Sequence, residues 1–123
     1  MKTVTFFEIP AFDFDRAVKF YETILGLKLS VMDYDNEKMA LFPADDGQCP
    51  GAVSWDSERT FLPSKNGVLI HLHITDMEKT ISAIEKNGGK ITRPKTKIES
   101  ESRGYFALFI DSEGNRLGLY SDK

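Results

Sequence analysis

The chain contains one sequence pattern twice. From Asp13 it reads DFDRAVKFYETILGLKL, and from Asp76 it reads DMEKTISAIEKNGGKI. Aligning the two aspartates places apolar, acidic and glycine positions of the two segments on one another. A repeat of this period indicates two copies of one supersecondary unit that bury their apolar faces together. Two such units predict a concavity that neither unit has alone.

Each copy predicts the element order β-α-β-β-β. In the first copy we expect strands over 4–9, 27–34, 38–42 and 52–55, and a helix that Asp13 caps and Gly26 ends. In the second we expect strands over 68–74, 90–92, 105–110 and 115–120, a helix that opens with a Thr75–Glu78 capping box, and a polar loop over 95–103. The predicted fold class is α+β: two tandem β-α-β-β-β units forming a cupped mixed sheet with helices on the outer face. We expect a single domain over 1–123, with units over 1–60 and 66–120.

The composition of the chain limits the classes of molecule that it is expected to bind. A net charge of −3 argues against nucleic acid and anionic membranes, which favour a basic protein face. Cys49 is the only cysteine, so no internal disulfide is possible and a reducing cytoplasm is the simplest location. No apolar run approaches membrane-spanning length. A small molecule is the expected partner.

Several segments resemble a known family. They are Phe7-Glu8-Ile9-Pro10 with the helix from Asp13 to Tyr21, Gly26-Leu27, 76–90, Arg103 to Ala107, and Asp111 to Asn115. Together they resemble the vicinal oxygen chelate superfamily, which includes glyoxalase I, extradiol dioxygenases and bleomycin-resistance proteins. The closest likeness is to small glyoxalase-like members. The resemblance implies two half-barrels forming a cup, a divalent ion held by four side chains in metal-using members, and a homodimer.

This chain departs from the family at the metal positions. Counting seven residues back from each repeat aspartate places the first-strand ligands on Phe6 and Leu69. The late-strand positions fall on Gly118 and near Val53 or Ser54. Phe, Leu and Gly offer no donor atom to a metal ion. We therefore expect no metal at the usual site and no cofactor.

Strand alternation suggests an alternative set of polar groups. Leu69, His71 and His73 are expected on one face of a strand, as are Phe6, Glu8 and Pro10. Glu8, His71 and His73 are thus the candidate catalytic residues, as acid and base or as ligands of a relocated divalent metal. A purely structural role fits these residues equally well: the histidines would hydrogen-bond polar neighbours in a wet cavity, and Glu8 would form an ion pair with a histidine or Arg116.

Aromatic side chains are the other candidates for ligand contact, although core packing explains any single Phe as well. Trp55, at a strand end, is the best candidate for a flat ligand. Arg103 lies in a loop that either closes over the cup, where Arg103 would anchor a carboxylate or phosphate, or is simply solvated. The candidate ligand-binding residues are Phe6, Phe42, Trp55, Leu69, Arg103 and Phe106.

Three functions fit these features. The preferred one is a glyoxalase-like small-molecule-binding protein without the usual metal. The second is a lyase or isomerase of the glyoxalase type that uses Glu8, His71 or His73, with or without a relocated metal. The third is a drug-sequestering resistance protein.

Overall fold

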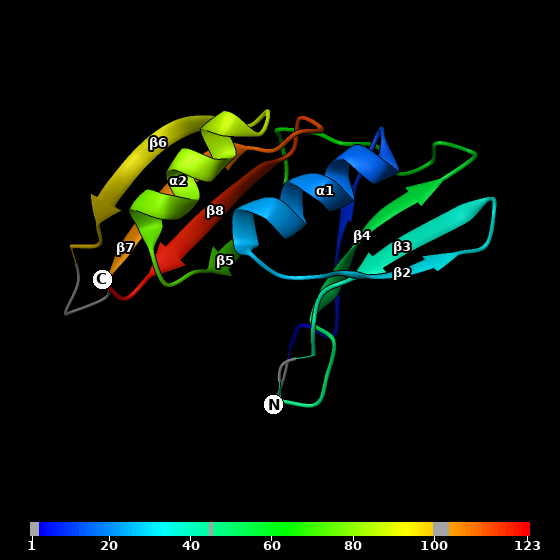
Figure 1. Ribbon diagram of the computed structural model, residues 1–123, viewed down its shortest axis with the longest axis horizontal. Helices are drawn as coiled ribbons and strands as arrows, with labels where there is room; N and C mark the ends of the chain where they lie inside the picture. Colours follow the sequence, from blue (N-terminus) through cyan, green and yellow to red (C-terminus); the bar gives the residue numbers. More distant parts are fainter. Residues whose placement is uncertain (1–2, 45, 100–103) are drawn as a thin grey trace.

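The computed structural model describes residues 3–44, 46–99 and 104–123, and the expected element order occurs in it twice (Figure 1). The first unit consists of β1 (Phe7–Pro10), α1 (Phe14–Leu25), β2 (Ser30–Asp33), β3 (Glu37–Leu41) and β4 (Gly51–Asp56). The second unit consists of β5 (His71–His73), α2 (Met77–Lys86), β6 (Lys90–Lys97), β7 (Tyr105–Ile110) and β8 (Arg116–Ser121). The sequence repeat is therefore a structural repeat.

Each unit forms one four-stranded mixed sheet, and the two sheets share one strand order. The orders are β1-β4-β3-β2 and β5-β8-β7-β6. In both sheets the first strand runs parallel to the last strand of its unit, while the other pairs are antiparallel. The predicted α+β fold of two β-α-β-β-β units is confirmed.

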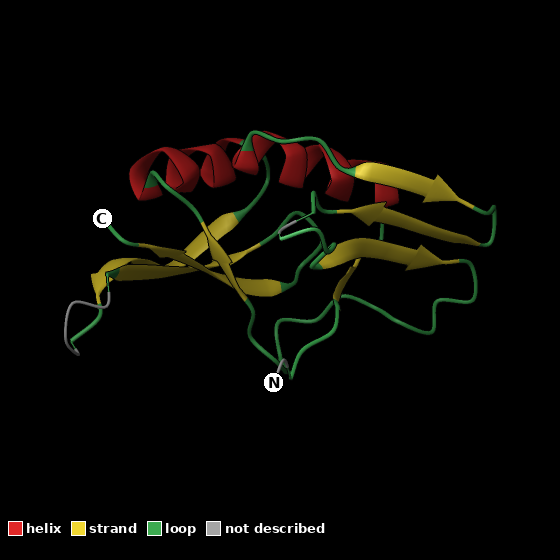
Figure 2. Cartoon of the chain, turned by 90° about the horizontal axis from the view of Figure 1, so that it is seen from below, coloured by secondary structure: helices red, strands yellow, loops and turns green. Residues whose placement is uncertain are grey.

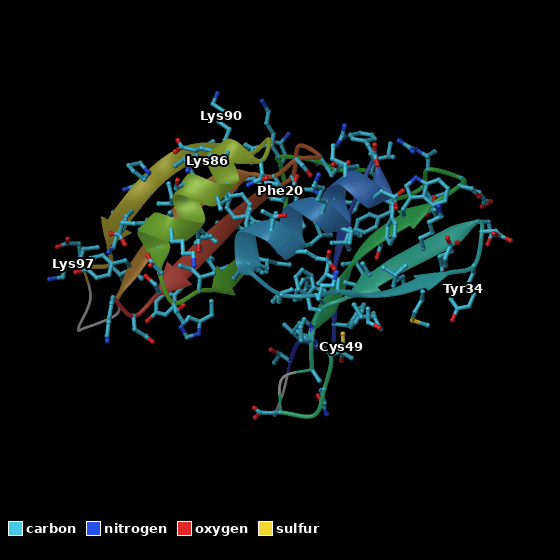
Figure 3. All side chains as sticks on the ribbon, viewed as in Figure 1. Phe20, Tyr34, Cys49, Lys86, Lys90 and Lys97 are labelled. Atoms are coloured by element: carbon cyan, nitrogen blue, oxygen red, sulfur yellow. The ribbon has the colours of Figure 1, made fainter. Side chains whose placement is uncertain are left out.

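Both helices lie on the same side of the two sheets, and they contact each other (Figure 2). The helix-facing side of each sheet is apolar and buried, with Ile9 and Val53 in the first sheet and Phe109 and Leu119 in the second. Phe20 of α1 lies between the helices in Figure 3, with its ring centroid 6.4 Å from that of Phe109. The two units therefore share one hydrophobic core, and their opposite sheet faces carry no helix.

The helix starts follow the repeat more closely than predicted. Asp13 caps α1 by accepting a hydrogen bond from the Arg16 N–H at 3.1 Å. Asp76 caps α2 in the same way, accepting from Lys79 N at 3.1 Å. The predicted Thr75–Glu78 capping box is wrong, because the aspartate one residue later makes the capping bond.

Four strands differ from the prediction by more than one residue at an end, among them β2, which is shorter than the predicted 27–34. β6 extends over eight residues, whereas the predicted strand ended at residue 92, two residues before Pro94. Register shifts on either side of Arg93 accommodate the proline in this edge strand. β1 likewise includes Pro10, whose missing N–H is tolerated because β1 is an edge strand. β5 is shorter than the predicted 68–74, so Leu69 precedes the strand.

Glu113, in the turn between β7 and β8, joins the two units. Its buried carboxylate accepts hydrogen bonds from the N–H groups of Phe12 (3.0 Å) and Asp13 (2.7 Å) at the start of α1. The Arg16 guanidinium donates two more, at 2.7 and 3.0 Å, and the Ser112 hydroxyl donates one at 2.8 Å. Burial alone would raise the pKa of Glu113, but these hydrogen bonds outweigh it and hold the pKa below the usual 4.5.

Asp111, in the same turn, forms a second buried link. It accepts a hydrogen bond from the Tyr21 hydroxyl of α1 at 2.6 Å, and Asn115 Nδ2 donates to it at 3.0 Å. Asn115 Nδ2 also donates to the Pro10 carbonyl at 2.8 Å. The sequence predicted only a short connection here, between the strands over 105–110 and 115–120. The turn is present, but its side chains also fix the orientation of the two sheets.

Candidate ligand-binding site

The helix-free face of the first sheet is polar and acidic. Strand register places Glu8, Ser54 and Asp56 on this face, opposite the buried Ile9 and Val53. Cross-strand pairing adds further residues of β3: Met39 lies beside Ser54, and Glu37 beside Asp56.

Glu8 is held in place by a buried hydroxyl. Ser54, which is 7% exposed, donates a hydrogen bond from Oγ to Glu8 Oε1 at 2.7 Å. No residue in the described part of the chain donates a hydrogen bond to the other carboxylate oxygen, or forms an ion pair with it. Glu8 is thus oriented from one side and available from the other. The predicted alternative of an ion pair between Glu8 and a histidine or Arg116 is not observed.

Two cavities adjoin at Glu8. One, of about 310 Å³, lies where the two units meet, and Arg116 of β8 also lines it. The other, of about 210 Å³, lies over the first sheet and is lined by Met39 and Trp55. Glu8 and Phe61 line both cavities, so a single ligand bound to the Glu8 carboxylate can extend into either cavity.

The two histidines lie elsewhere, at the edge of the second sheet. The His71 ring packs beside Phe106 with centroids 6.4 Å apart, and His73 Nε2 lies 3.5 Å from Asp122 Oδ2. Both histidines and Phe42 line a third, larger cavity of about 750 Å³, which reaches the C-terminal end of α1 and the start of α2. The structure does not place Glu8 in that cavity, so it does not bring the three candidate catalytic residues together.

The side chains at the family's metal positions do not fit a metal ion. Phe6 and Leu69 are hydrocarbon, and Ser54 offers one hydroxyl that is already bonded to Glu8. At Gly118, the imidazole of His71 occupies the space into which a side chain would project. Within 3–44, 46–99 and 104–123, no three His, Cys, Asp or Glu side chains come close enough to hold a metal. The Glu8–His71–His73 set therefore forms no such group in one chain.

The remaining predicted contact residues are dispersed. Trp55 borders the smaller cavity, but strand alternation places its ring on the helix-facing side of β4, where it packs against the core and Lys38 Nζ lies 5.2 Å from its centroid. Phe42 is buried in the core, 6.1 Å from the Tyr21 ring. Phe106 carries the Arg93 guanidinium 5.3 Å above its ring. Phe6 and Leu69 line none of the three cavities, and Arg103 lies outside the described residues.

The prediction missed Phe61 and the ligand-facing position of Arg116. Phe61 lies between the two predicted units, in the linker over 61–65, where Phe61-Leu62 is an apolar pair in an otherwise polar stretch. Arg116 was considered only as a partner for Glu8. This apolar pair was the sequence signal that the linker lines a cavity.

Comparison with known proteins identifies the family. Residues 3–119 match the model of the Glyoxalase/Bleomycin resistance protein/Dioxygenase superfamily. The chain belongs to this superfamily. The resemblance to vicinal oxygen chelate proteins is thereby confirmed.

Two curated relatives are similar over most of their length. A glyoxylase-like domain-containing protein from Didymella fabae is 34% identical over 113 residues, covering 88% of this chain and 84% of that protein. The lactoylglutathione lyase of Haemophilus influenzae is 24% identical over 123 residues, covering 87% of this chain and 90% of the enzyme.

Solved structures share the fold. Maize glyoxalase I has a TM-score of 0.71 at 23% identity, covering 96% of this chain and 45% of the maize chain. This chain thus spans less than half of that enzyme. A glyoxalase/bleomycin resistance protein from Albidiferax ferrireducens has a TM-score of 0.69 at 16% identity, with 98% of both chains covered. Among the described residues, no helix has the length and apolar character needed to cross a membrane.

Proposed function

We propose that this protein binds a compact small molecule on its helix-free face, without the metal ion used by other members of its family. The observation that carries the proposal is Glu8. It is oriented by buried Ser54, has one oxygen without a hydrogen bond from the described residues, and lines two adjoining cavities. Phe61 and Met39 supply apolar walls next to it. A few placed polar groups in an apolar hollow are typical of a small-molecule site.

The geometry suggests how Glu8 contributes. Because Ser54 holds Oε1, the second oxygen can accept an N–H or O–H of a ligand without first giving up another protein partner. Met39 and Phe61 offer apolar surfaces for a flat or carbonyl-bearing group next to that oxygen. Recognition would then depend on one charge-assisted hydrogen bond and on apolar burial.

Binding is tested by a thermal-shift screen of size-matched small molecules, because a ligand that binds only the native state raises its melting temperature. We expect the hits to weaken in Glu8→Gln and in Ser54→Ala. Glu85→Gln, on the exposed side of α2, is the charge-matched control and should behave like the wild type. Hits that stay unchanged in both Glu8→Gln and Ser54→Ala would remove this face from the proposal.

A glyoxalase-type lyase or isomerase is the second candidate. It is supported by the similarity to the Haemophilus influenzae lactoylglutathione lyase and by the Glu8 oxygen that is free to take a proton next to a carbonyl. The histidines lie in another cavity, so Glu8 would act without them in the same chain. The test is turnover of a hemithioacetal of glutathione, with and without a chelator. Turnover that Glu8→Gln abolishes while ligand binding persists supports an enzyme, and binding without turnover supports sequestration.

A homodimer is the quaternary state that best fits the helix-free faces. Apart from Glu8 and Arg116, which face the ligand, the face of the first sheet carries Glu37 and Asp56, whereas that of the second carries Arg93. Two copies related by a two-fold axis can pair the acidic face of each with the basic face of the other. Light scattering after size exclusion should give a dimer mass that falls with rising salt, and a monomer at low salt contradicts the proposal.

The free thiol of Cys49 fits a reducing compartment, and we include a cytoplasmic location in the proposal. Its Sγ donates to the carbonyls of Phe42 and Gly51 at 3.3 and 3.2 Å.

A further inference from the structure

We infer that the 310 Å³ cavity between the two units selects an amphoteric ligand: one with a carboxylate, a protonated amine and an apolar body. This inference rests on the proposed function and names the class of ligand. It follows from two opposite charges that face one cavity without meeting.

Glu8 supplies the negative side. Among the described residues, only the neutral Ser54 hydroxyl donates a hydrogen bond to its carboxylate. None of the described lysines, arginines or histidines forms an ion pair with it. Glu8 is exposed, so an ammonium group in the cavity would pair with its carboxylate in place of water.

Arg116 supplies the positive side. It lies on β8 next to the buried Leu117, and its side chain is half-buried. No described residue forms an ion pair or side-chain hydrogen bond with its guanidinium. The planar guanidinium presents five donors in a geometry that suits a carboxylate. An anionic group on a ligand would satisfy it.

The two charges line the same cavity, yet their charged atoms are not in ion-pair contact. If the cavity only had to be neutral, a direct Glu8–Arg116 pair would achieve this at close range. Both charged groups instead border the cavity without pairing with each other. A ligand with one charge would pair one wall and leave the other unpaired, whereas an amphoteric ligand pairs both.

The walls between the charges are apolar and partly exposed. Phe61 is 44% exposed, Leu62 45% and Val68 91%, and all three line this cavity. Exposed apolar side chains around a hollow are typical of a ligand-binding groove. A volume of about 310 Å³ is at the lower end of small-molecule sites, so the apolar body is no larger than about one ring.

The test uses three molecules that share a phenyl ring and chain: phenylalanine carries both charges, phenethylamine only the amine, and 3-phenylpropionate only the carboxylate. Affinities are measured by NMR titration of the full chain at low salt. Phenylalanine is expected to bind about ten-fold more tightly than either analogue, since each charged hydrogen bond corresponds to about that factor. Shifts should include the amides of Glu8 and Leu117.

Two variants test which side chain pairs with which charged group of the ligand. Glu8→Gln should reduce phenylalanine to the affinity of 3-phenylpropionate, and Arg116→Gln should reduce it to that of phenethylamine. Glu85→Gln and Lys86→Gln on α2 are matched controls that should change neither affinity (Figure 3). Equal binding of the three molecules, or a preference for phenylalanine that survives both cavity variants, overturns the inference.

A panel of size-matched zwitterions, cations, anions and neutral molecules separates this inference from the proposed function. Hits concentrated among zwitterions support it. Hits confined to another class that depend on Glu8 overturn the amphoteric class but leave the proposed function intact. If no class shifts the melting temperature or the amide resonances, both are wrong.

Discussion

Replacing Glu113 with Gln tests whether the β7–β8 turn joins the two units. The substitution keeps the shape of the side chain but removes the charge and converts one accepting oxygen into an NH₂ group. Oε1 of Glu113 receives three of the five hydrogen bonds and Oε2 receives two. A Gln in the best orientation keeps the three bonds to its oxygen, loses the one from Arg16 Nε, and can donate from Nε2 to the Ser112 hydroxyl instead of accepting from it.

The expected loss of stability is about 3 kcal/mol. Hydrogen bonds to a charged group contribute about 1.5–3 kcal/mol each, and neutral ones about 1 kcal/mol, so the three retained bonds weaken and one Arg16 bond disappears. The Glu113 side chain is 0% exposed, which keeps these interactions strong. Arg16 is 53% exposed, so water compensates part of its loss and the estimate stays near 3 rather than above it. For a chain of this size the melting temperature should fall by about 12 °C.

Urea unfolding and differential scanning calorimetry measure this effect. Glu78→Gln is the matched control, because Glu78 forms an ion pair with Lys95 at 2.8 Å on the exposed surface of the second unit. It should leave the midpoint nearly unchanged. A Glu113→Gln midpoint as close to the wild type as the control would show that the turn does not hold the units together.

The same carboxylate predicts a pH dependence. Because the pKa of Glu113 in the folded state is below its usual 4.5, its contribution to stability is complete above that value and is lost as pH falls through the folded-state pKa. The stability difference between wild type and Glu113→Gln should therefore shrink below about pH 4.5. A difference that grows with acidity contradicts the assignment.

Two further predictions concern buried contacts. Tyr21→Phe should lower the stability by about 2 kcal/mol, because it removes the 2.6 Å hydrogen bond to Asp111. Burial and the Asp111 charge raise the Tyr21 pKa well above 10, so this stabilisation is complete below about pH 10 and is lost as the pH rises further. Denaturant unfolding of wild type and variant across alkaline pH measures this loss. Gly51→Ala should cost about 2–3 kcal/mol, because the new methyl meets the Phe7 carbonyl and ring, whereas Gly118→Ala should cost less than about 1 kcal/mol, because the exposed His71 ring can move away. Chemical denaturation of the two glycine variants checks the contrast, and equal losses would show that the Phe7 backbone is not rigid.

The repeat was sufficient to predict the fold, because each unit has local signals that agree. Asp13 and Gly26 mark the ends of α1, and apolar residues at helical spacing predict the buried side. The prediction failed where a signal depends on context. Pro94 stops a central strand but is tolerated at an edge with register shifts, and the sequence does not show that β6 is an edge.

The candidate site was harder to predict, because it depends on how the units are oriented. Strand alternation correctly placed Glu8 on the open face, and the same rule placed His71 on the open face of the second sheet. It did not show that these two faces contribute to different cavities. That separation is set by Asp111, Glu113 and Asn115, whose residue types in the sequence indicate a turn and nothing more.

The two units have kept one framework while their open faces have become different. In the second sheet, His71 packs over Gly118 and beside Phe106, so an imidazole covers a position where the resemblance implies a metal ligand. In the first sheet, Ser54 occupies the corresponding region and orients Glu8 instead. The two observations agree: His71 covers one position where the resemblance implies a metal ligand, and the Ser54 hydroxyl near the other is hydrogen-bonded to Glu8. They favour a site whose chemistry depends on Glu8 and its apolar surroundings, and restoring a single donor at Gly118 would have to displace His71 before it could bind an ion.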